Sequence, residues 1–346
     1  MKAMVMTHIA DLLHDPAPLK MVCLPEPVPG PGEIVIKVST CGVCHTELDE
    51  IEGRTTPPNL PIIPGHQVIG TVAGRGQGAS RFQPGDRVGV GWIYGACGRC
   101  HWCLHDQENL CGSFLATGRD RDGGYAEYMK IGEGYAYAIP EAFSDAQAAP
   151  LLCAGAIGYR SLRLSGILDG QHLGLTGFGA SAHLVLKMVR HRFPGTSVYV
   201  FARNEDERRF ALELGALWAG DTVESPPAPL NAIIDTTPAW RPVVAAMRHL
   251  TRGGRLVINA IRKETGDKAA LLELDYPAHL WLEKEIKTVA NVTRRDIGEF
   301  LDLAARIPLL PEIQEYDLEE ANLALGDLKT KRVRGAKVLR IANSKR

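Results

Sequence analysis

Short apolar runs separated by Gly- and Pro-rich turns characterise the chain up to about residue 150. Three of these runs are rich in β-branched residues and predict strands, at 33–38 (EIVIKV), 67–72 (QVIGTV) and 87–90 (RVGV). Turn sequences, PGPG at 29–32 and PGD at 84–86, interrupt the chain around them. This pattern predicts a small all-β barrel in the N-terminal part of the chain.

A different pattern begins at about residue 154, where apolar strands alternate with helical stretches. We expect strands at 173–175, 197–202, 232–235, 255–260 and 286–292, and helices at 180–191, 205–214 and near 241–250. Such alternation predicts βαβ units, and therefore an α/β domain with a doubly wound parallel sheet. Near the C-terminal end, residues 336–341 (AKVLRI) predict a strand that returns to the first domain.

Composition narrows the class of protein. The chain has 346 residues, 45% apolar and 23% charged, as expected for two globular domains. Its net charge of −1 gives no reason to expect a nucleic-acid or anionic-membrane partner. We find no apolar run of membrane-spanning length and no signal-peptide core, so we expect a cytoplasmic protein without a membrane partner.

Four of the eight cysteines fall in one loop with the spacing C-x2-C-x2-C-x7-C: Cys97, Cys100, Cys103 and Cys111. Four thiolates complete the tetrahedral shell of a zinc ion and leave no position for a substrate, so the loop predicts a structural zinc site. An iron–sulfur cluster is disfavoured by the x7 gap, and disulfides are disfavoured by a reducing compartment. We interpret His101 and His105, in the same loop, as bystanders.

Three further residues are candidate metal ligands: Cys44 in CGVCHTE, His66 in PGHQ and Cys153 in LLCAG. Considered singly, each has an alternative as an ordinary buried side chain, and their spacing alone does not prove that they converge. Cys41 precedes Cys44 by three positions, which also leaves open a thiol switch.

A glycine loop, G-x-G-x-x-A at 177–182, follows an apolar strand and opens a helix. Gly177 allows a tight turn, and Gly179 lets the backbone approach a pyrophosphate group at the helix N-terminus, next to Ala180. In this strand–loop–helix setting the motif predicts dinucleotide binding.

The order of these motifs resembles that of the zinc-dependent alcohol dehydrogenases of the medium-chain dehydrogenase/reductase superfamily. The series runs CGVCHTE at 41–47, PGHQVIG at 64–70, the four-cysteine loop, GGYAEY at 123–128, APLLCAG at 149–155 and the glycine loop, and covers almost the whole chain. The resemblance implies a GroES-like catalytic β-barrel domain at 1–153 and 292–346, with a structural zinc lobe at about 92–113. It implies a Rossmann dinucleotide-binding domain at 154–291.

By the same resemblance, Cys44, His66 and Cys153 hold a catalytic zinc, a Cys2His set with one open position. Thr46 resembles the hydroxyl that accepts the substrate proton, and Glu47 the acid that hydrogen-bonds the ligand histidine. Trp92 resembles an aromatic residue of the substrate pocket that favours small, unbranched substrates; the alternative is an ordinary packed tryptophan.

Two positions depart from the family pattern. Asp49 stands where many members have a histidine that completes a proton relay, and a solvent-exposed carboxylate there is still expected to pass protons, with an altered alkaline pH dependence. Gln67 replaces the glutamate of the family's GHE motif, and the less negative surroundings are expected to make the zinc a stronger Lewis acid.

The residue at the end of the second Rossmann strand indicates which dinucleotide is preferred. NAD-binding folds usually carry an Asp or Glu there, which binds the ribose 2′-hydroxyl. Here the segment is Ala202-Arg203-Asn204, which favours NADP or dual use, with Arg208 or Arg209 assisting. The alternative is that these arginines pair with neighbouring glutamates on a solvated helix. His45 resembles a pyrophosphate contact, whereas Arg334 matches the family's C-terminal arginine poorly.

These observations predict a zinc-dependent alcohol dehydrogenase with two zinc ions per subunit that interconverts small alcohols and aldehydes or ketones by hydride transfer to and from NAD(P). The alternative is a polyol, aromatic-alcohol or aldehyde reductase of the same fold. A remote alternative is a non-catalytic NADPH-binding redox sensor that switches at Cys41 or Cys44. The resemblance also implies a homodimer or homotetramer.

Overall fold

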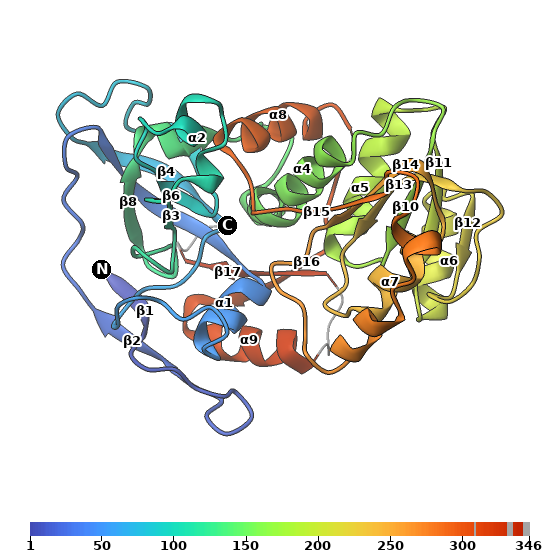
Figure 1. The fold of residues 1–346 in the computed structure, drawn as a ribbon. Coiled ribbons are helices and arrows are strands. Elements are labelled where there is room, and N and C mark those ends of the chain that lie inside the picture. The colour runs from blue at the N-terminus through green and yellow to red at the C-terminus, as the bar shows by residue number, and fades with distance from the viewer. Residues whose placement is uncertain (308, 331–334, 342–346) are drawn as a thin grey trace. The chain divides into compact units, whose positions relative to one another are not determined.

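The computed structural model describes residues 1–307, 309–330 and 335–341 and divides the chain into two compact units (Figure 1). One unit comprises Met1–Cys153 and Thr293–Arg346, and the other is the continuous segment Ala154–Val292. In the residues that are described, no helix combines the length and the apolar composition needed to cross a membrane.

The first unit is built on a seven-stranded sheet in the order β16-β17-β3-β4-β5-β9, with β8 also paired to β3. The strands are β3 (Glu33–Val43), β4 (Val68–Arg75), β5 (Arg87–Val90), β8 (Tyr128–Gly132), β9 (Ala136–Ala138), β16 (Ile313–Asp317) and β17 (Ala336–Arg340). Two small antiparallel pairs accompany it: β1 (Lys2–Met6) with β2 (Leu19–Cys23), and β6 (Ile93–Gly95) with β7 (Leu115–Ala116).

The predicted strands lie in this sheet, but β3 continues past Val38 to Val43. Its second half contains small and polar residues that carry no strand pattern, and they are extended because β4 and β17 pair with them on either side. The predicted return of the C-terminal segment is confirmed, since β17 pairs antiparallel with β3 from Lys337–Val43 to Arg340–Thr40.

Short helices complete the first unit: α1 (His45–Ile51), α2 (His101–Leu104), α3 (Asp145–Pro150), α8 (Arg294–Ala304) and α9 (Ala321–Thr330). Ser144 begins α3 and Thr293 begins α8, each through a capping box with the third helical residue. The sequence pattern missed α1, because almost every residue of that helix is buried and no polar face marks its period.

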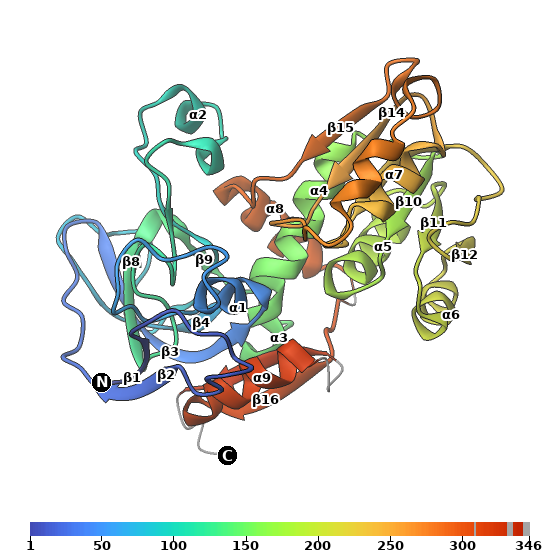
Figure 2. The same cartoon turned by 60° about the horizontal axis from the view of Figure 1, so that its bottom comes forward.

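The second unit contains a six-stranded parallel sheet in the order β12-β11-β10-β13-β14-β15. The strands are β10 (His172–Thr176), β11 (Ser197–Phe201), β12 (Trp218–Gly220), β13 (Leu230–Asp235), β14 (Leu250–Ile258) and β15 (Glu285–Thr288). Its helices are α4 (Ala156–Ser165), α5 (Ala180–Arg192), α6 (Glu205–Glu213) and α7 (Arg241–Met247) (Figure 2).

The strand order reverses between β10 and β13, which makes this the topological switch point of the sheet. Right-handed crossovers place α5 and α6 on one face and α7 on the other. The α/β class and the Rossmann-type sheet predicted from the sequence are therefore confirmed. In sheets of this kind the ligand binds at the carboxyl ends of the two strands at the switch point.

Candidate active site and metal centres

Cys44, His66 and Cys153 converge in the first unit, although the sequence separates them widely. One ligand atom from each lies within 4.8 Å of the others. Nε2 of His66 faces Sγ of Cys44 at 3.8 Å. A tetrahedral zinc with Zn–S about 2.3 Å and Zn–N about 2.0 Å requires an S–N distance of about 3.5 Å, so these residues fit a zinc ion.

Cys44 is positioned by the start of α1. It is the N-cap of that helix, where its sulfur accepts a hydrogen bond from the backbone N–H of Thr46 at 3.3 Å. Its own N–H donates to Oε2 of Glu47 at 2.9 Å, which completes a capping box. Two local bonds therefore fix the direction of the Cys44 side chain.

His66 is held by the turn that leads into β4. Gly65 adopts φ +100°, and a Cβ there would lie 2.4 Å from the buried ring of Tyr125, so only glycine fits. Tyr125 comes from the GGYAEY segment, which explains why the two motifs occur together. The turn fixes the backbone beside His66, whose side chain is 1% exposed.

Cys153 lies in a π-helical turn, Leu151–Gly155, that follows α3. Such a turn adds a residue to the helical repeat and changes the direction in which a side chain points, and it is frequent at functional sites. The APLLCAG motif thus gives Cys153 an orientation that a continuous α-helix would not provide.

The second nitrogen of His66 pairs with Glu47. Nδ1 of His66 lies 2.5 Å from Oε1 of Glu47, and both side chains are buried. Burial alone would lower the pKa of His66, but the Glu47 carboxylate raises it well above its usual value. Burial likewise acts to raise the pKa of Glu47, and His66 lowers it. This pairing orients the ring so that Nε2 faces the sulfur ligand.

Trp92 lies against the ligand His66, and Gln67 follows His66 in the chain. The Trp92 ring is buried and meets the ring of His66 edge-on, with centroids 5.1 Å apart. Gln67 is 3% exposed, and its Nε2 has no hydrogen-bond partner among the described residues. Gln67 is thus a buried neutral side chain directly after His66 in the chain, and its effect on a zinc ion stays a prediction.

Asp49 differs from the exposed carboxylate that we expected. Its side chain is 4% exposed, and Oδ1 lies 2.5 Å from Nε of Arg54. The chain turns back directly after α1, because the N–H groups of Arg54 and Thr55 both bond to the backbone oxygen of Asp49. The turn places the guanidinium of Arg54 against the carboxylate of Asp49, and the carboxylate is thereby removed from solvent. Its part in proton transfer stays a prediction.

Cys41 does not share the environment of a reactive thiol. It is 0% exposed and faces the barrel core, and burial raises its pKa well above the usual range. Buried thiols of this kind are inert toward redox exchange. The remote interpretation as a redox sensor is therefore unsupported at this position.

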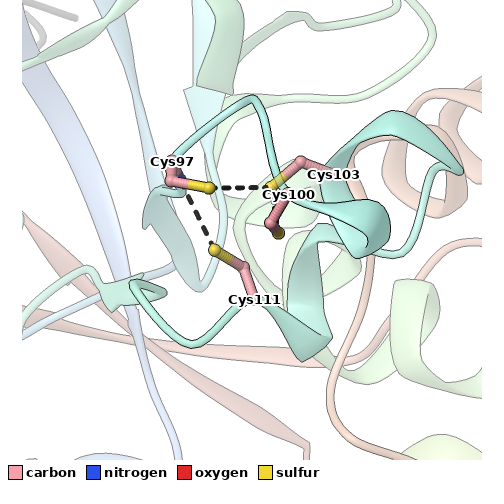
Figure 3. Close-up of side chains that lie close together, drawn as sticks. All are labelled: Cys97, Cys100, Cys103 and Cys111. Atoms are coloured by element: carbon pink, nitrogen blue, oxygen red, sulfur yellow. Dashed lines mark hydrogen bonds between the residues drawn. The ribbon is translucent and has the colours of Figure 1, made fainter.

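The four-cysteine loop brings its thiols together around one point (Figure 3). Sγ of Cys103 lies 3.6 Å from Sγ of Cys100 and 3.9 Å from Sγ of Cys97. A tetrahedron of sulfurs around zinc has edges of about 3.8 Å, whereas a disulfide requires about 2.0 Å. A multi-iron cluster would need a larger cage, so the loop fits one zinc ion.

Backbone groups prepare the same loop for metal. Bonds from the N–H groups of Arg99 and Cys100 lower the pKa of Cys97 to about 6. His101 and His105 are exposed, and their rings contact each other rather than the thiols. Glu108, 2% exposed, accepts bonds from the backbone N–H and the Nε of Arg294 at 2.7 and 3.1 Å, which ties the loop to α8.

In the second unit, the glycine loop lies at the carboxyl end of β10. Gly177 has φ +76°, and no atom lies within 4 Å of the point where a Cβ on Gly179 would sit. Gly179 is the N-cap of α5, and no side chain caps that helix. The first N–H groups of α5, from Ala180 onward, are thus left for an anionic ligand such as a pyrophosphate.

The predicted specificity segment follows β11. Ala202 is buried, and Arg203 is exposed to solvent. Asn204 has a structural role as the N-cap of α6, where it accepts from the N–H of Asp206 at 2.8 Å. Arg208 donates to the backbone oxygens of Ala202 and Arg203.

Three further residues were considered as dinucleotide contacts: Arg209, His45 and Arg334. Arg209 lies on the exposed face of α6, 3.6 Å from Asp206, whereas the alternative interpretation expected a glutamate as its partner. His45 is exposed at the first position of α1. Arg334 lies outside the described residues.

Sequence reasoning missed a buried charged pair beside the glycine loop. Asp235, the last residue of β13, is 0% exposed and pairs with Lys263 from the segment after β14. The sequence contained one indication of this pair, because the apolar strand AIID at 232–235 ends in the acid Asp235. A charge at the end of a buried strand requires a partner of opposite charge.

Comparisons with known proteins agree with this geometry. The profile of the family described as "Alcohol dehydrogenase GroES-like domain" matches residues 30–141. The chain is 40% identical over 332 residues to a "Probable alcohol dehydrogenase AdhA" of Mycobacterium tuberculosis, covering 94% of each chain. It is 32% identical to an alcohol dehydrogenase of Geobacillus stearothermophilus, covering 90% of this chain and 92% of that one. A solved cinnamyl alcohol dehydrogenase of Sorghum bicolor has a TM-score of 0.81 at 25% identity, covering 99% and 98%.

Proposed function

The chain belongs to the zinc-containing medium-chain alcohol dehydrogenases, and from this premise we propose its substrates, its dinucleotide and the roles of its residues. The enzyme interconverts alcohols with aldehydes or ketones. The substrates we propose are small alcohols. The observation that carries the proposal is the convergence of two thiols and one imidazole beside a buried carboxylate and an aromatic ring.

Cys44, His66 and Cys153 would hold the zinc on which the reaction depends. When bound, zinc supplies a Lewis acid that lowers the pKa of an alcohol group. Glu47 keeps the proton of His66 on Nδ1, which leaves Nε2 free to act as a ligand. The bond from the N–H of Thr46 to Sγ of Cys44 fixes Thr46 beside the ligand, where its hydroxyl accepts the substrate proton.

Asp49 is the proposed next group in proton transfer, although Arg54 already holds one of its oxygens. The variant Asp49→Asn tests this role. A changed pH dependence of kcat with an unchanged fold would support it, and an unchanged pH profile would assign Asp49 to the structure of the turn after α1.

Trp92 forms one wall of the proposed substrate pocket. Its ring lies edge-on to the ligand His66, so a substrate bound at the metal would meet a large, rigid aromatic surface. This arrangement favours small, unbranched alcohols. The alternative, an aromatic-alcohol or aldehyde reductase, draws support from the similarity to the cinnamyl alcohol dehydrogenase of Sorghum bicolor.

We infer that the enzyme uses NADP or both dinucleotides. Of the arginines after β11, Arg208 already bonds to backbone oxygens, whereas Arg203 is exposed next to the small Ala202. No carboxylate stands at the strand end to repel a 2′-phosphate or to bind a ribose 2′-hydroxyl. The dinucleotide accepts or returns the hydride when bound.

A homodimer formed through the edge strand β15 is the proposed assembly. All four residues of β15 are exposed, and Tyr276 and Trp281 nearby are 60% and 54% exposed. Antiparallel pairing of two copies about Ile286 would place Glu285 opposite Lys287, which is self-complementary. Light scattering on the wild type and on Ile286→Lys tests this assembly, and equal masses would count against it.

A cytoplasmic location is proposed on chemical grounds. None of the eight cysteines forms a disulfide, and both thiol-rich centres require reduced sulfur.

The deciding experiment measures the reduction of NAD and of NADP by the zinc-loaded protein with short, branched and aromatic alcohols. Turnover that falls with branching supports the small-alcohol proposal, and a preference for aromatic alcohols supports the alternative. The ratio of kcat/KM for the two dinucleotides decides the cofactor. Absence of turnover with every alcohol at full zinc occupancy would overturn the proposed substrates.

A further inference from the structure

The carboxyl end of β13 carries a buried network of hydrogen bonds around Asp235. The hydroxyls of Thr176 and Thr237 donate to Oδ1 of Asp235 at 2.6 and 2.8 Å. The ammonium of Lys263 binds the other oxygen, Oδ2. Asp235 is 0% exposed and the Lys263 side chain 7% exposed, so both charges are removed from water.

Lys263 makes two further bonds, and these join two segments of the chain. Its Nζ donates to the backbone oxygens of Thr237 and Ala239 at 2.7 and 2.9 Å. Three acceptors use all three protons of the ammonium group. The side chain thus reaches from the segment after β14 to the loop after β13 and fixes that loop, residues 235–239, at three points.

The fixed loop lies directly against the glycine loop. A Cβ on Gly177 would be 2.9 Å from both the hydroxyl of Thr236 and the methyl group of Thr237. The N–H and the hydroxyl of Thr236 also both donate to the backbone oxygen of Thr176, at 3.0 Å. Loop 235–239 therefore lines the switch point between β10 and β13, where a dinucleotide would bind.

We propose that Lys263 is a positioning residue that holds loop 235–239 as the wall of the dinucleotide site. The proposal rests on the dinucleotide binding proposed above. A loop fixed in advance loses less conformational freedom when the ligand binds, so its preorganisation appears as affinity. The ammonium group of Lys263 has no proton left to donate to the ligand, because all three are engaged within the chain.

The test measures dissociation constants of NADH and NADPH by fluorescence titration for the wild type and for Lys263→Met. The variant is expected to bind either dinucleotide at least about 10-fold more weakly, and its KM to rise more than its kcat falls. Lys284→Met is a matched control. Lys284 also bonds two backbone oxygens, those of Met247 and Ala278, but lies at the opposite end of the sheet.

A double variant separates positioning from stability. Lys263→Met leaves the Asp235 charge buried and unpaired, which lowers the free energy of unfolding. Adding Asp235→Asn removes that charge and is expected to restore part of the stability, while the bonds to Thr237 and Ala239 stay absent and binding stays weak. Recovery of affinity together with stability would overturn the proposal, as would wild-type affinity in Lys263→Met. A wild type that binds neither dinucleotide would instead refute the proposed function.

Discussion

The pairing of Glu47 with His66 leads to a quantitative expectation for the variant Glu47→Gln. In the native chain, one carboxylate oxygen faces Nδ1 of His66 at 2.5 Å, and the other accepts from the N–H of Cys44 at 2.9 Å. A glutamine has one amide oxygen, so it can accept from only one of these donors and turns its NH2 group toward the other. One buried donor therefore loses its partner.

The cost follows from the burial of this pair. The His66 and Glu47 side chains are 1% and 0% exposed, so water cannot replace the lost acceptor. An unsatisfied buried donor costs about 1–3 kcal/mol. Loss of a hydrogen-bond partner of a metal ligand weakens metal binding by about 10- to 100-fold, or about 1.4–2.7 kcal/mol, in agreement with that range. We expect zinc binding at this centre to weaken by this factor.

The second zinc site of the same chain provides an internal reference. During titration with a chelator, metal analysis should show Glu47→Gln losing one zinc per chain at about 10- to 100-fold lower chelator concentration, while the zinc of the four-cysteine loop is retained. Glu108→Gln is the control. It also neutralises a buried carboxylate, but Glu108 lies in the four-cysteine loop and not beside His66.

Equal chelator profiles for the wild type and Glu47→Gln, with circular dichroism showing the native fold in both, would refute this reasoning. They would mean that His66 keeps its orientation and tautomer without the carboxylate.

Further variants probe the other parts of the molecule. Cys44→Ser should abolish turnover while the fold stays native by circular dichroism, and retained activity would exclude it as a ligand. Cys103→Ala should lower the melting temperature and release one zinc per chain, because it opens the closed sulfur shell; an unchanged melting temperature would argue against a structural zinc. Ala202→Asp should shift the ratio of kcat/KM toward NAD, and an unchanged ratio would place the specificity residue elsewhere. Lys329→Met should lower stability at pH 7 more than at pH 3. Burial acts to raise the pKa of Glu52, but its bonds to Lys329 and Arg54 lower that pKa. The stability that these bonds contribute is therefore present above the ordinary glutamate pKa of about 4.3, and it is lost as the pH falls through the depressed pKa. Urea unfolding at both pH values measures this, and an equal deficit at both would contradict it.

Each metal ligand belongs to a recognisable motif, but the convergence of Cys44, His66 and Cys153 is implied by the resemblance to a family and not by their spacing. The capping box at Cys44 and the loop around Cys97 are set by residues close to the ligands in the chain, whereas the Gly65 turn also depends on Tyr125, 60 positions further along. Strands could also be predicted from the sequence where short apolar runs are separated by turn sequences. The run at 87–90, for example, is strand β5 in the structure.

The features that sequence reasoning missed depend on partners far away in the chain. Glu108 meets Arg294 across 186 positions, and no local pattern pairs them. Asp49 was expected at the surface because an isolated aspartate is commonly solvated, but the turn after α1 covers it with Arg54. Lys263 looks like an ordinary loop lysine until the fold places it above the end of β13.

The division of the first unit between the two ends of the chain has a consequence for synthesis on the ribosome. The second unit is continuous, so it can fold as soon as it emerges, whereas β3 must wait for β17, which is translated about 290 residues after Val43. At about 5–20 residues per second, the outer edge of β3 stays unpaired for roughly 15–60 s. During that interval Cys41–Val43 present an open strand edge next to the thiol of Cys44. Strand β17 therefore protects a metal ligand that lies far ahead of it in the chain.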